Sequence, residues 1–153
     1  MAEFKVSRQI DIAARPRDIA SVLSDFRRWP EFSAFETTES DIDREFRGAP
    51  RGVGAVYEYN SNEERSAGIM EITEARDDLV AVQLRFLKPF KSQMDHRFEL
   101  TTKAADLTEV RWVMHGEHKG LLGVLAKYLL PMEKLMGPQI ERGLQRLKDL
   151  LEG

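Results

Sequence analysis

The side chains best suited to chemistry in this sequence stand within rows of alternating apolar residues. His96 lies between Met94 and Phe98 in one row, and Tyr57 and Tyr59 occupy alternate positions of another. An imidazole titrates near neutral pH, so His96 is a candidate catalytic acid or base, or a hydrogen-bond donor to a ligand carbonyl. The plainer alternative is a histidine bonded to a neighbour or placed at the sheet rim. The tyrosine hydroxyls could orient a ligand, although packing at a sheet edge explains them equally well.

Several catalytic and binding chemistries are excluded by what the sequence lacks. It contains no cysteine, which rules out disulfides, thiolate nucleophiles and cysteine-ligated metals. The cluster Gly48–Gly54 lacks the lysine–serine ending of a phosphate-binding loop and predicts a hairpin turn. His115 and His118 stand three apart in a predicted strand, so their side chains point to opposite faces and are poorly placed to share an ion. We expect no metal and no cofactor.

Composition and charge are those of one globular domain covering residues 1–153. Hydrophobic residues make up 42% of the chain and charged residues 32%, which favours a packed core over disorder. The formal net charge of −3 argues against nucleic-acid binding, which needs excess positive charge. No signal peptide is visible, and the longest apolar stretch, Leu121–Met132, is too short to span a bilayer. We expect a cytoplasmic protein.

The sequence predicts that the chain begins with a strand. Phe4, Val6, Ile10 and Ile12 alternate with polar residues, which is typical of a half-buried strand. Arg8 interrupts the apolar face. The simplest expectation is an arginine that points outward beyond the covered part of the sheet. The alternative is an arginine that pairs with a ligand carboxylate or with an internal glutamate.

Two short helices are predicted after this strand. Pro16 suits the first turn of a helix because its missing N–H costs nothing there. Apolar residues from Ile19 to Phe26 follow at spacings of three and four, which marks one helix face. Trp29 and Phe32 then repeat at a spacing of three, which indicates a second short helix or a helical turn.

From Glu36 to His118 the pattern is that of six strands. Turn residues such as Arg76–Asp78 and Ala104–Asp106 place hairpin connections between consecutive segments. The predicted strands are Thr37–Phe46, Ala55–Tyr59, Ala67–Thr73, Leu79–Leu87, Ser92–Thr102 and Thr108–Glu117. Six successive strands joined mostly by short turns indicate an antiparallel meander.

The last third of the chain changes to a helical period, with Pro131 and Pro138 as the expected kinks. Its apolar stripe consists of Leu122, Leu125, Leu129, Met132, Met136, Ile140, Leu144, Leu147 and Leu151. No other apolar stripe is large enough to cover a sheet of seven strands with one apolar face. A strongly curved sheet wrapped over one helix often leaves a gap, and such gaps are typical small-molecule sites.

Strand parity predicts which side chains line that gap. Alternate positions of a strand share a face, and methionine and aromatic side chains suit a flexible apolar ligand. From the strands we expect Tyr57, Tyr59, Met70, Leu84, Phe86, Met94, His96, Phe98, Trp112 and Met114 to line it, and from the helix Leu125, Leu129, Met132 and Met136. For each residue taken alone, the alternative is that it only fills the core.

Motifs in a fixed order carry a family resemblance over essentially the whole chain. Val6–Asp25 looks like a first strand and helix, and Trp29-Pro-Glu-Phe32 is similar to the aromatic–proline segment that follows it. Gly52-Val-Gly54, Thr108–Trp112 and Gly143–Lys148 match a turn, the last strand and the final helix. The sequence thus resembles the START-like, helix-grip (SRPBCC) superfamily, in its polyketide cyclase/dehydrase-like branch. The resemblance implies an α+β helix-grip fold, in which a seven-stranded curved antiparallel sheet wraps over a long C-terminal helix.

The resemblance also implies binding, and with it a capacity for transport, of a hydrophobic small molecule such as a lipid, a quinone or a polyketide-like compound. The alternative is a polyketide cyclase or dehydratase in which His96 or a tyrosine transfers protons, so the sequence leaves enzymatic activity open. A third class is an interaction protein that presents a lipid or quinone to a partner. Lys88–Lys91 and Lys119–Leu125 could form a rim that touches a membrane surface transiently. Either a monomer or a homodimer fits the sequence.

Overall fold

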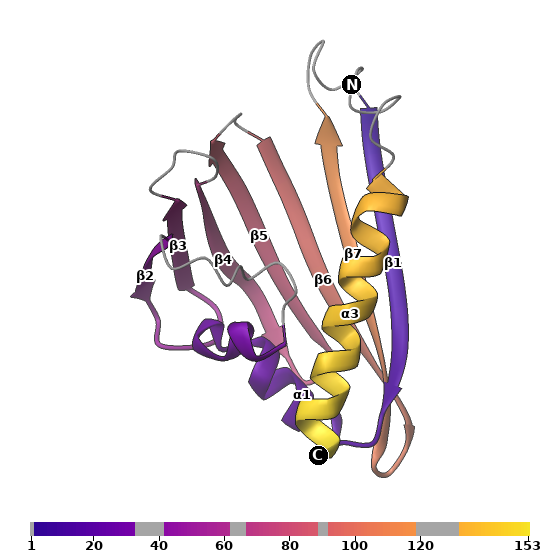
Figure 1. Cartoon of the computed structure of the whole chain (residues 1–153). Helices are drawn as coiled ribbons and strands as arrows, with labels where there is room; N and C mark the ends of the chain where they lie inside the picture. The colour runs from indigo at the N-terminus through magenta and orange to yellow at the C-terminus, as the bar shows by residue number, and fades with distance from the viewer. Residues whose placement is uncertain (1, 33–41, 62–66, 89–91, 119–131) are drawn as a thin grey trace.

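A seven-stranded antiparallel sheet organises the chain (Figure 1). The computed structural model describes residues 2–32, 42–61, 67–88, 92–118 and 132–153. The strands lie in the order β1-β7-β6-β5-β4-β3-β2, so the six later strands form a meander and β1 joins it beside β7. Their bounds are β1 Ala2–Ile12, β2 Ile42–Gly48, β3 Ala55–Ser61, β4 Ala67–Arg76, β5 Leu79–Lys88, β6 Ser92–Ala104 and β7 Leu107–His118.

The element order confirms the predicted helix-grip fold. Both predicted hairpin connections are present, because β4 and β5 are joined across Asp77–Asp78 and β6 and β7 across Ala105–Asp106. The predicted strand from Thr37 to Phe46 is described from Ile42 onward and continues to Gly48.

Three helical segments accompany the sheet: α1 Pro16–Leu23, the 3-10 helix η1 Phe26–Glu31, and α3 Met132–Glu152. Pro16 starts α1 as expected, and Asp25 caps η1 by accepting a hydrogen bond from the backbone N–H of Arg27. Pro138 lies inside α3. The predicted helical residues before Met132, with the expected kink at Pro131, lie outside the described residues.

The helices cover different parts of the same sheet face. Within the described chain, α3 packs mainly against β1, with lighter contact to β7 and η1, whereas α1 and η1 approach β3 to β6. Figure 1 shows this division, with α3 in front of β7 and β1 and the two short helices near the lower end of the sheet. We call this covered side the concave face.

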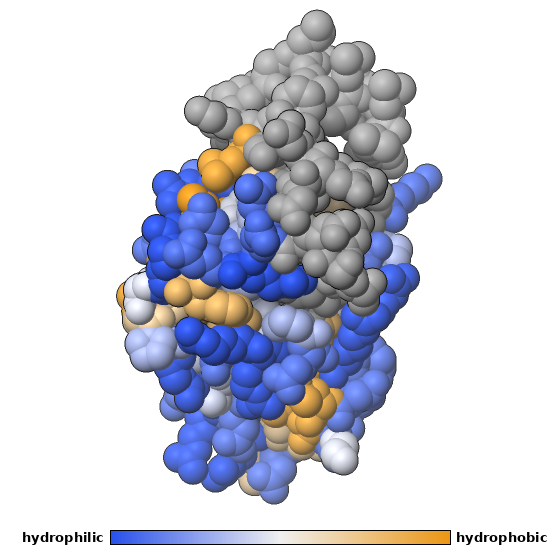
Figure 2. All heavy atoms as spheres, turned by 60° about the vertical axis from the view of Figure 1, so that its left-hand side comes forward, coloured by the Kyte–Doolittle hydropathy of each residue, from blue (hydrophilic) through white to orange (hydrophobic). Residues whose placement is uncertain are grey.

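The opposite face is polar, as expected for a sheet with one face in water. Charged and polar side chains such as Arg97, Glu99 and Arg111 stand there, and they alternate with the buried positions of their strands. In the view of Figure 2 most of the described surface is hydrophilic, and Val53 and Leu87 are the exposed large hydrophobic residues of the described chain. Among the described helices, none has the length and apolar content needed to cross a membrane.

Two glycines allow α3 to lie close to the sheet. A Cβ atom placed at Gly143 would stand 2.7 Å from Cζ3 of Trp112, and one placed at Gly137 would collide with Nη2 of Arg8. Neither glycine has a positive φ, so the lack of a side chain rather than backbone freedom explains both positions.

The expectation that Arg8 points outward is wrong. Arg8 stands opposite Trp112 in the register of β1 and β7 and therefore shares its concave face. Its Nη1 lies 2.5 Å from Glu133 Oε1 and its Nε lies 2.7 Å from Glu141 Oε1. These hydrogen bonds and charges raise the pKa of the guanidinium above its ordinary value. Pairing with glutamates of the chain itself is correct, although Glu133 and Glu141 are more than half exposed rather than internal. The two carboxylates of α3 let the charge sit within an otherwise apolar row.

The contact at Gly143 gives a stability prediction. Alanine in place of glycine inside an exposed helix stabilises it by up to about 1 kcal/mol. At Gly143 the added methyl group meets a fixed indole, and overpacking costs about 1–3 kcal/mol. We therefore expect Gly143→Ala to lower the free energy of unfolding, measured by urea denaturation. Arg142→Ala, at the adjacent exposed position, should change it by less than about 0.5 kcal/mol. A more stable Gly143→Ala variant would contradict this packing.

Candidate functional site

The predicted lining residues form continuous rows across the concave face. Tyr57 lies opposite Met70, Met70 opposite Leu84, and Leu84 opposite Met94. The neighbouring row runs from Tyr59 over Gly68 to Phe86. Side chains directly opposite each other on antiparallel strands share a face. We call Tyr57, Tyr59, Met70, Leu84, Phe86 and Met94 the concave patch.

Burial separates the concave patch from a floor that is packed more completely. Phe98 and Trp112 are 0% exposed and Met114 is 1% exposed, whereas Met70, Leu84 and Met94 retain 7–8% of their surface. Tyr59 and Phe86 of the patch are half-buried. The floor residues pack against other protein groups, as for example Trp112 with the ring of Phe32, 6.3 Å away between centroids. Tyr57 is the exception in the patch, because it is 2% exposed. The other five patch residues leave some surface uncovered by protein atoms.

His96 is the polar residue of the floor. It lies opposite Val82 on β5 and Met114 on β7 and is 4% exposed. The indole Nε1 of Trp112 donates a hydrogen bond to His96 Nδ1 across 3.0 Å. An indole N–H is a donor only, so Nδ1 must be the unprotonated nitrogen and Nε2 carries the ring proton. The expectation of a histidine bonded to a neighbouring side chain is confirmed.

Burial lowers the pKa of His96 from its ordinary 6.5 to about 4, because the charged imidazolium loses its hydration. The hydrogen bond from Trp112 acts in the same sense, since a doubly protonated ring cannot accept it. His96 is therefore neutral at physiological pH, with its proton on Nε2.

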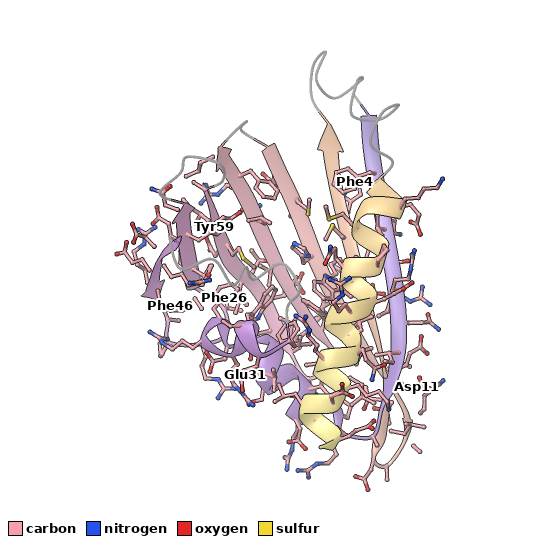
Figure 3. The ribbon with its side chains drawn as sticks, in the orientation of Figure 1. Phe4, Asp11, Phe26, Glu31, Phe46 and Tyr59 are labelled. Carbon is pink, nitrogen blue, oxygen red and sulfur yellow. The ribbon has the colours of Figure 1, made fainter. Side chains whose placement is uncertain are left out.

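An aromatic corner stands at the edge of the sheet where β2 and β3 pair. The ring of Phe46 contacts Tyr57 at 5.2 Å between centroids, and Tyr57 contacts Phe26 at 5.9 Å and Tyr59 at 6.2 Å. Figure 3 labels Phe26, Phe46 and Tyr59 at this edge. The Nε atom of Arg44 donates a hydrogen bond to the hydroxyl of the buried Tyr57 across 3.0 Å. The corner thus combines flat apolar rings with a cation.

A second guanidinium stands beside the same corner. The Cζ atom of Arg27 lies 4.7 Å from the centroid of the Phe46 ring, which is a cation–π arrangement. Arg27 also donates a hydrogen bond from Nη1 to the carbonyl of Pro50 across 3.3 Å. Positive charge is therefore held at this edge of the concave face, although the whole chain carries a net charge of −3.

The structure brings all ten strand residues of the predicted lining onto one face, and on the helix Met136 is half-buried against the core. Leu125 and Leu129 lie outside the described residues, as does the side chain of Met132. Whether any of these residues contacts a ligand stays a prediction.

Sequence reasoning identified Arg8 but missed Arg27 and Arg44 beside the aromatic corner. Arg44 occupies the same face as Phe46 in a short strand rich in charged residues, where a period of two gives no clear signal. The spacing of Trp29 and Phe32 correctly predicted a helical turn. This turn places both rings in contact with Phe98.

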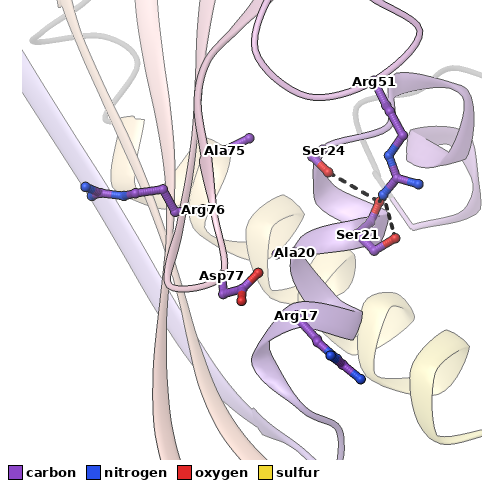
Figure 4. A pocket seen from close by; sticks show the side chains of 8 residues that line it. All are labelled: Arg17, Ala20, Ser21, Ser24, Arg51, Ala75, Arg76 and Asp77. Carbon is purple, nitrogen blue, oxygen red and sulfur yellow. Dashed lines mark hydrogen bonds between the residues drawn. The ribbon is translucent and has the colours of Figure 1, made fainter.

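A small surface pocket of about 160 Å³ lies between α1 and the β4–β5 turn (Figure 4). Its lining includes Arg17, Arg51, Arg76 and Asp77. Arg51 bonds to the Oγ atom of Ser21 across 2.6 Å, and Figure 4 shows Arg17 and Arg76 directed away from the pocket. The guanidinium groups do not converge, so the pocket has no geometry for holding an anion.

The described residues contain no cluster of three or more histidine, aspartate or glutamate side chains suited to a metal ion. His115 is exposed, and the side chain of His118 lies outside the described part of the chain.

The family follows from fold and sequence together. Residues 3–152 match the family described as polyketide cyclase / dehydrase and lipid transport, and the protein belongs to this family. The family description names enzymes that act on polyketides and proteins that transport lipids. Hydrophobic small molecules are the class of ligand that these two activities share. Among curated protein sequences no match is found.

Solved structures of similar fold extend over nearly the whole chain. Norcoclaurine synthase from Thalictrum flavum, as a point mutant in complex with a transition-state analogue, superposes with a TM-score of 0.71 at 13% identity, covering 98% of this chain and 94% of its own. A START superfamily protein from Mycobacterium smegmatis superposes with a TM-score of 0.63 at 18% identity, covering 97% of both chains. The Aha1 dimer from Colwellia psychrerythraea superposes with a TM-score of 0.62 at 17% identity, covering 97% of this chain and 96% of its own. At these identities the likeness establishes the fold alone.

The environment of His96 predicts a pH dependence of stability. Its pKa is about 4 in the folded chain and 6.5 ordinarily, so the unfolded chain binds the proton more readily. The contribution of neutral His96 to stability is therefore full well above pH 6.5 and is lost progressively as the pH falls toward 4. Between pH 7.5 and 5 the loss through this residue is about 2 kcal/mol.

His96→Asn is the matched control, because an amide oxygen can accept the Trp112 hydrogen bond without titrating. Urea denaturation of both proteins at several pH values isolates the contribution of His96. The free-energy difference between wild type and His96→Asn should shift by about 2 kcal/mol between pH 7.5 and 5. A difference that stays constant with pH would show that His96 titrates normally in the folded chain.

Proposed function

We propose that the protein binds a hydrophobic small molecule over the concave patch, between the sheet and the C-terminal helix. The observation that carries this proposal is the continuous row of methionine, leucine and aromatic side chains across the concave face. Its neighbouring row ends in Tyr59 and Phe86, which are only half-buried, whereas Phe98 and Trp112 of the floor are fully covered. Membership in a family of polyketide enzymes and lipid carriers supports the same ligand class.

The composition of the patch favours a ligand with a long or variable apolar body. The methionine side chains adapt to different shapes, and the tyrosine and phenylalanine rings offer flat contact area. A lipid, a quinone or a polyketide-like compound fits this lining. The predicted helix residues Leu125, Leu129, Met132 and Met136 would contact such a ligand from the other side.

Carriage is better supported than proton-transfer catalysis. A catalytic base should have a pKa near the working pH, whereas burial lowers that of His96 to about 4. The Nδ1 atom already accepts a hydrogen bond from Trp112, so it is not the atom that would remove a proton. For binding, His96 needs only to be a neutral polar residue within the floor.

The absence of cysteine from the sequence fits a reducing compartment, and we place this function in the cytoplasm.

Native mass spectrometry of gently purified protein tests the proposal. We expect a hydrophobic small molecule to co-purify with the protein. Extraction followed by mass spectrometry then identifies it. Leu84→Trp should remove it, because the larger ring fills the centre of the patch. Leu87→Trp, on the same strand at an exposed position, should retain it. The urea midpoints of both variants establish that they are folded.

Leu84→Phe provides a milder variant if the tryptophan unfolds the chain. The proposal is contradicted by wild-type protein that is empty and fails to bind the neutral dye Nile red. It is equally contradicted if folded Leu84→Trp and Leu87→Trp retain a ligand to the same extent.

A further inference from the structure

Positive charge is concentrated at one end of the molecule. Residues 15–31 and 47–54 contain six arginines against two aspartates and one glutamate, a formal charge of +3 in a chain whose whole charge is −3. These segments hold α1, η1 and the connection between β2 and β3, which lie together near the lower end of the sheet in Figure 1. The charge of the chain is therefore polarised toward this end.

Half of these six arginines pair with a carboxylate of the chain, and half do not. Within the described residues, Arg17, Arg27 and Arg51 form no ion pair. All three side chains are exposed. Three positive charges thus stand in water at this end of the protein without a carboxylate in contact with them.

Hydrogen bonds to neutral oxygen atoms bring these three arginines onto adjoining elements. The Nη2 atom of Arg51 donates to Oγ of Ser21 across 2.6 Å and to the carbonyl of the same residue across 3.2 Å (Figure 4). Arg17 lies one turn before Ser21 on α1 and therefore on the same helix face. Arg27 donates to the carbonyl of Pro50, the residue before Arg51. These bonds fix positions and leave the charges in place.

The connection between β2 and β3 adds an apolar tip beside the arginines. Residues 48–54 include one charged side chain, that of Arg51. Pro50 and Val53 on either side of it are exposed, Val53 to 60%. A single exposed valine is ordinary on a protein surface. Here it is combined with a cluster of positive charges, and the two together make an amphipathic surface.

This tip is held in a fixed shape. Gly52 and Gly54 flank Val53 with φ angles of 73° and 93°, which a residue with a side chain rarely adopts. The N–H of Gly52 donates to the carbonyl of Ser24 at the end of α1, and the N–H of Gly54 donates to that of Ile72 on β4. The exposed valine is therefore presented by an anchored turn.

An anionic bilayer is the partner that this combination fits. The guanidinium groups spread over a surface instead of converging on one point, so they suit many headgroups in a plane better than one small anion. Arginines near an anionic leaflet are attracted by its surface potential. An exposed apolar side chain next to them can leave water at the boundary of the acyl chains. A soluble polyanion offers no such apolar layer.

We propose that Arg17, Arg27 and Arg51, together with Pro50 and Val53, form a surface that docks on membranes containing anionic lipids. We call these five residues the arginine surface. It adjoins the aromatic corner, because Arg27 belongs to both, so docking brings the β2 edge of the concave patch near the lipid. The docking itself does not require that the concave patch hold a ligand.

Co-sedimentation with lipid vesicles tests this docking. The comparison is between vesicles of phosphatidylcholine alone and vesicles that also contain phosphatidylglycerol, both at low salt. We expect the wild-type protein to bind the vesicles with phosphatidylglycerol and to ignore those without it. Raising the salt to about 1 M should release the protein, because the Debye length then falls to about 3 Å.

Single substitutions assign the binding to the arginine surface. Arg17→Gln and Arg51→Gln should each lower the partition coefficient about fivefold, and Val53→Ser should lower it about threefold. Arg85→Gln is the matched control, because it changes the net charge equally and Arg85 is an exposed residue of β5 on the face opposite to Leu84. It should leave the partition coefficient unchanged. Urea midpoints establish that each variant is folded.

Three results would overturn the proposal. The first is wild-type protein that does not bind the anionic vesicles at low salt. The second is binding that falls equally in Arg17→Gln and Arg85→Gln, because net charge alone then accounts for it. The third is release of the protein from the vesicles by soluble poly-glutamate, which would indicate an acidic protein partner instead of lipid. Nile red binding tests the proposed function separately, so the two proposals can fail independently.

Discussion

The indole of Trp112 is the contact on which the arrangement of helix and sheet depends. It lies at the centre of the floor, fully buried, with Gly143 of α3 directly above it. Its ring contacts that of Phe98 in a tilted arrangement at 4.7 Å between centroids, and its N–H holds His96 in one tautomer. A larger residue in the helix or a smaller one in the strand would alter the height of α3 over the sheet. The close approach is possible because glycine leaves room for the ring.

The contact between Trp112 and Gly143 divides the concave face into two regions that differ in how closely the helix packs on the sheet. Near β1 and β7 the helix lies close to the sheet, the packing is complete, and the ion pairs of Arg8 with Glu133 and Glu141 hold the helix laterally. Toward β2 the described part of α3 does not reach the strands, and the patch retains some exposed apolar surface. Rigid packing on one side can thus support a site of adaptable methionine and aromatic side chains on the other.

Much of this arrangement could be predicted from the sequence because a period of two assigns every residue of a strand to a face. The row from Tyr57 to Met94 follows directly from it, and the register confirms that those side chains share a face. The partners of Arg8 did not follow, because the period places Arg8 on the apolar face without showing which carboxylates balance its charge. Its partner Glu141 stands 133 residues later in the chain. The bond between Trp112 and His96 also depends on register, which periodicity leaves open.

Methyl NMR of protein with ¹³C-labelled methionines would test the ligand site most directly. Met70 and Met94 belong to the patch, whereas Met114 belongs to the closed floor beneath it. A ligand over the patch predicts that titration with the neutral dye Nile red shifts the methyl signals of Met70 and Met94 in a saturable manner and leaves that of Met114 nearly unchanged. Signals of Met70 and Met94 that do not respond would contradict binding over the concave patch, whatever happens at Met114.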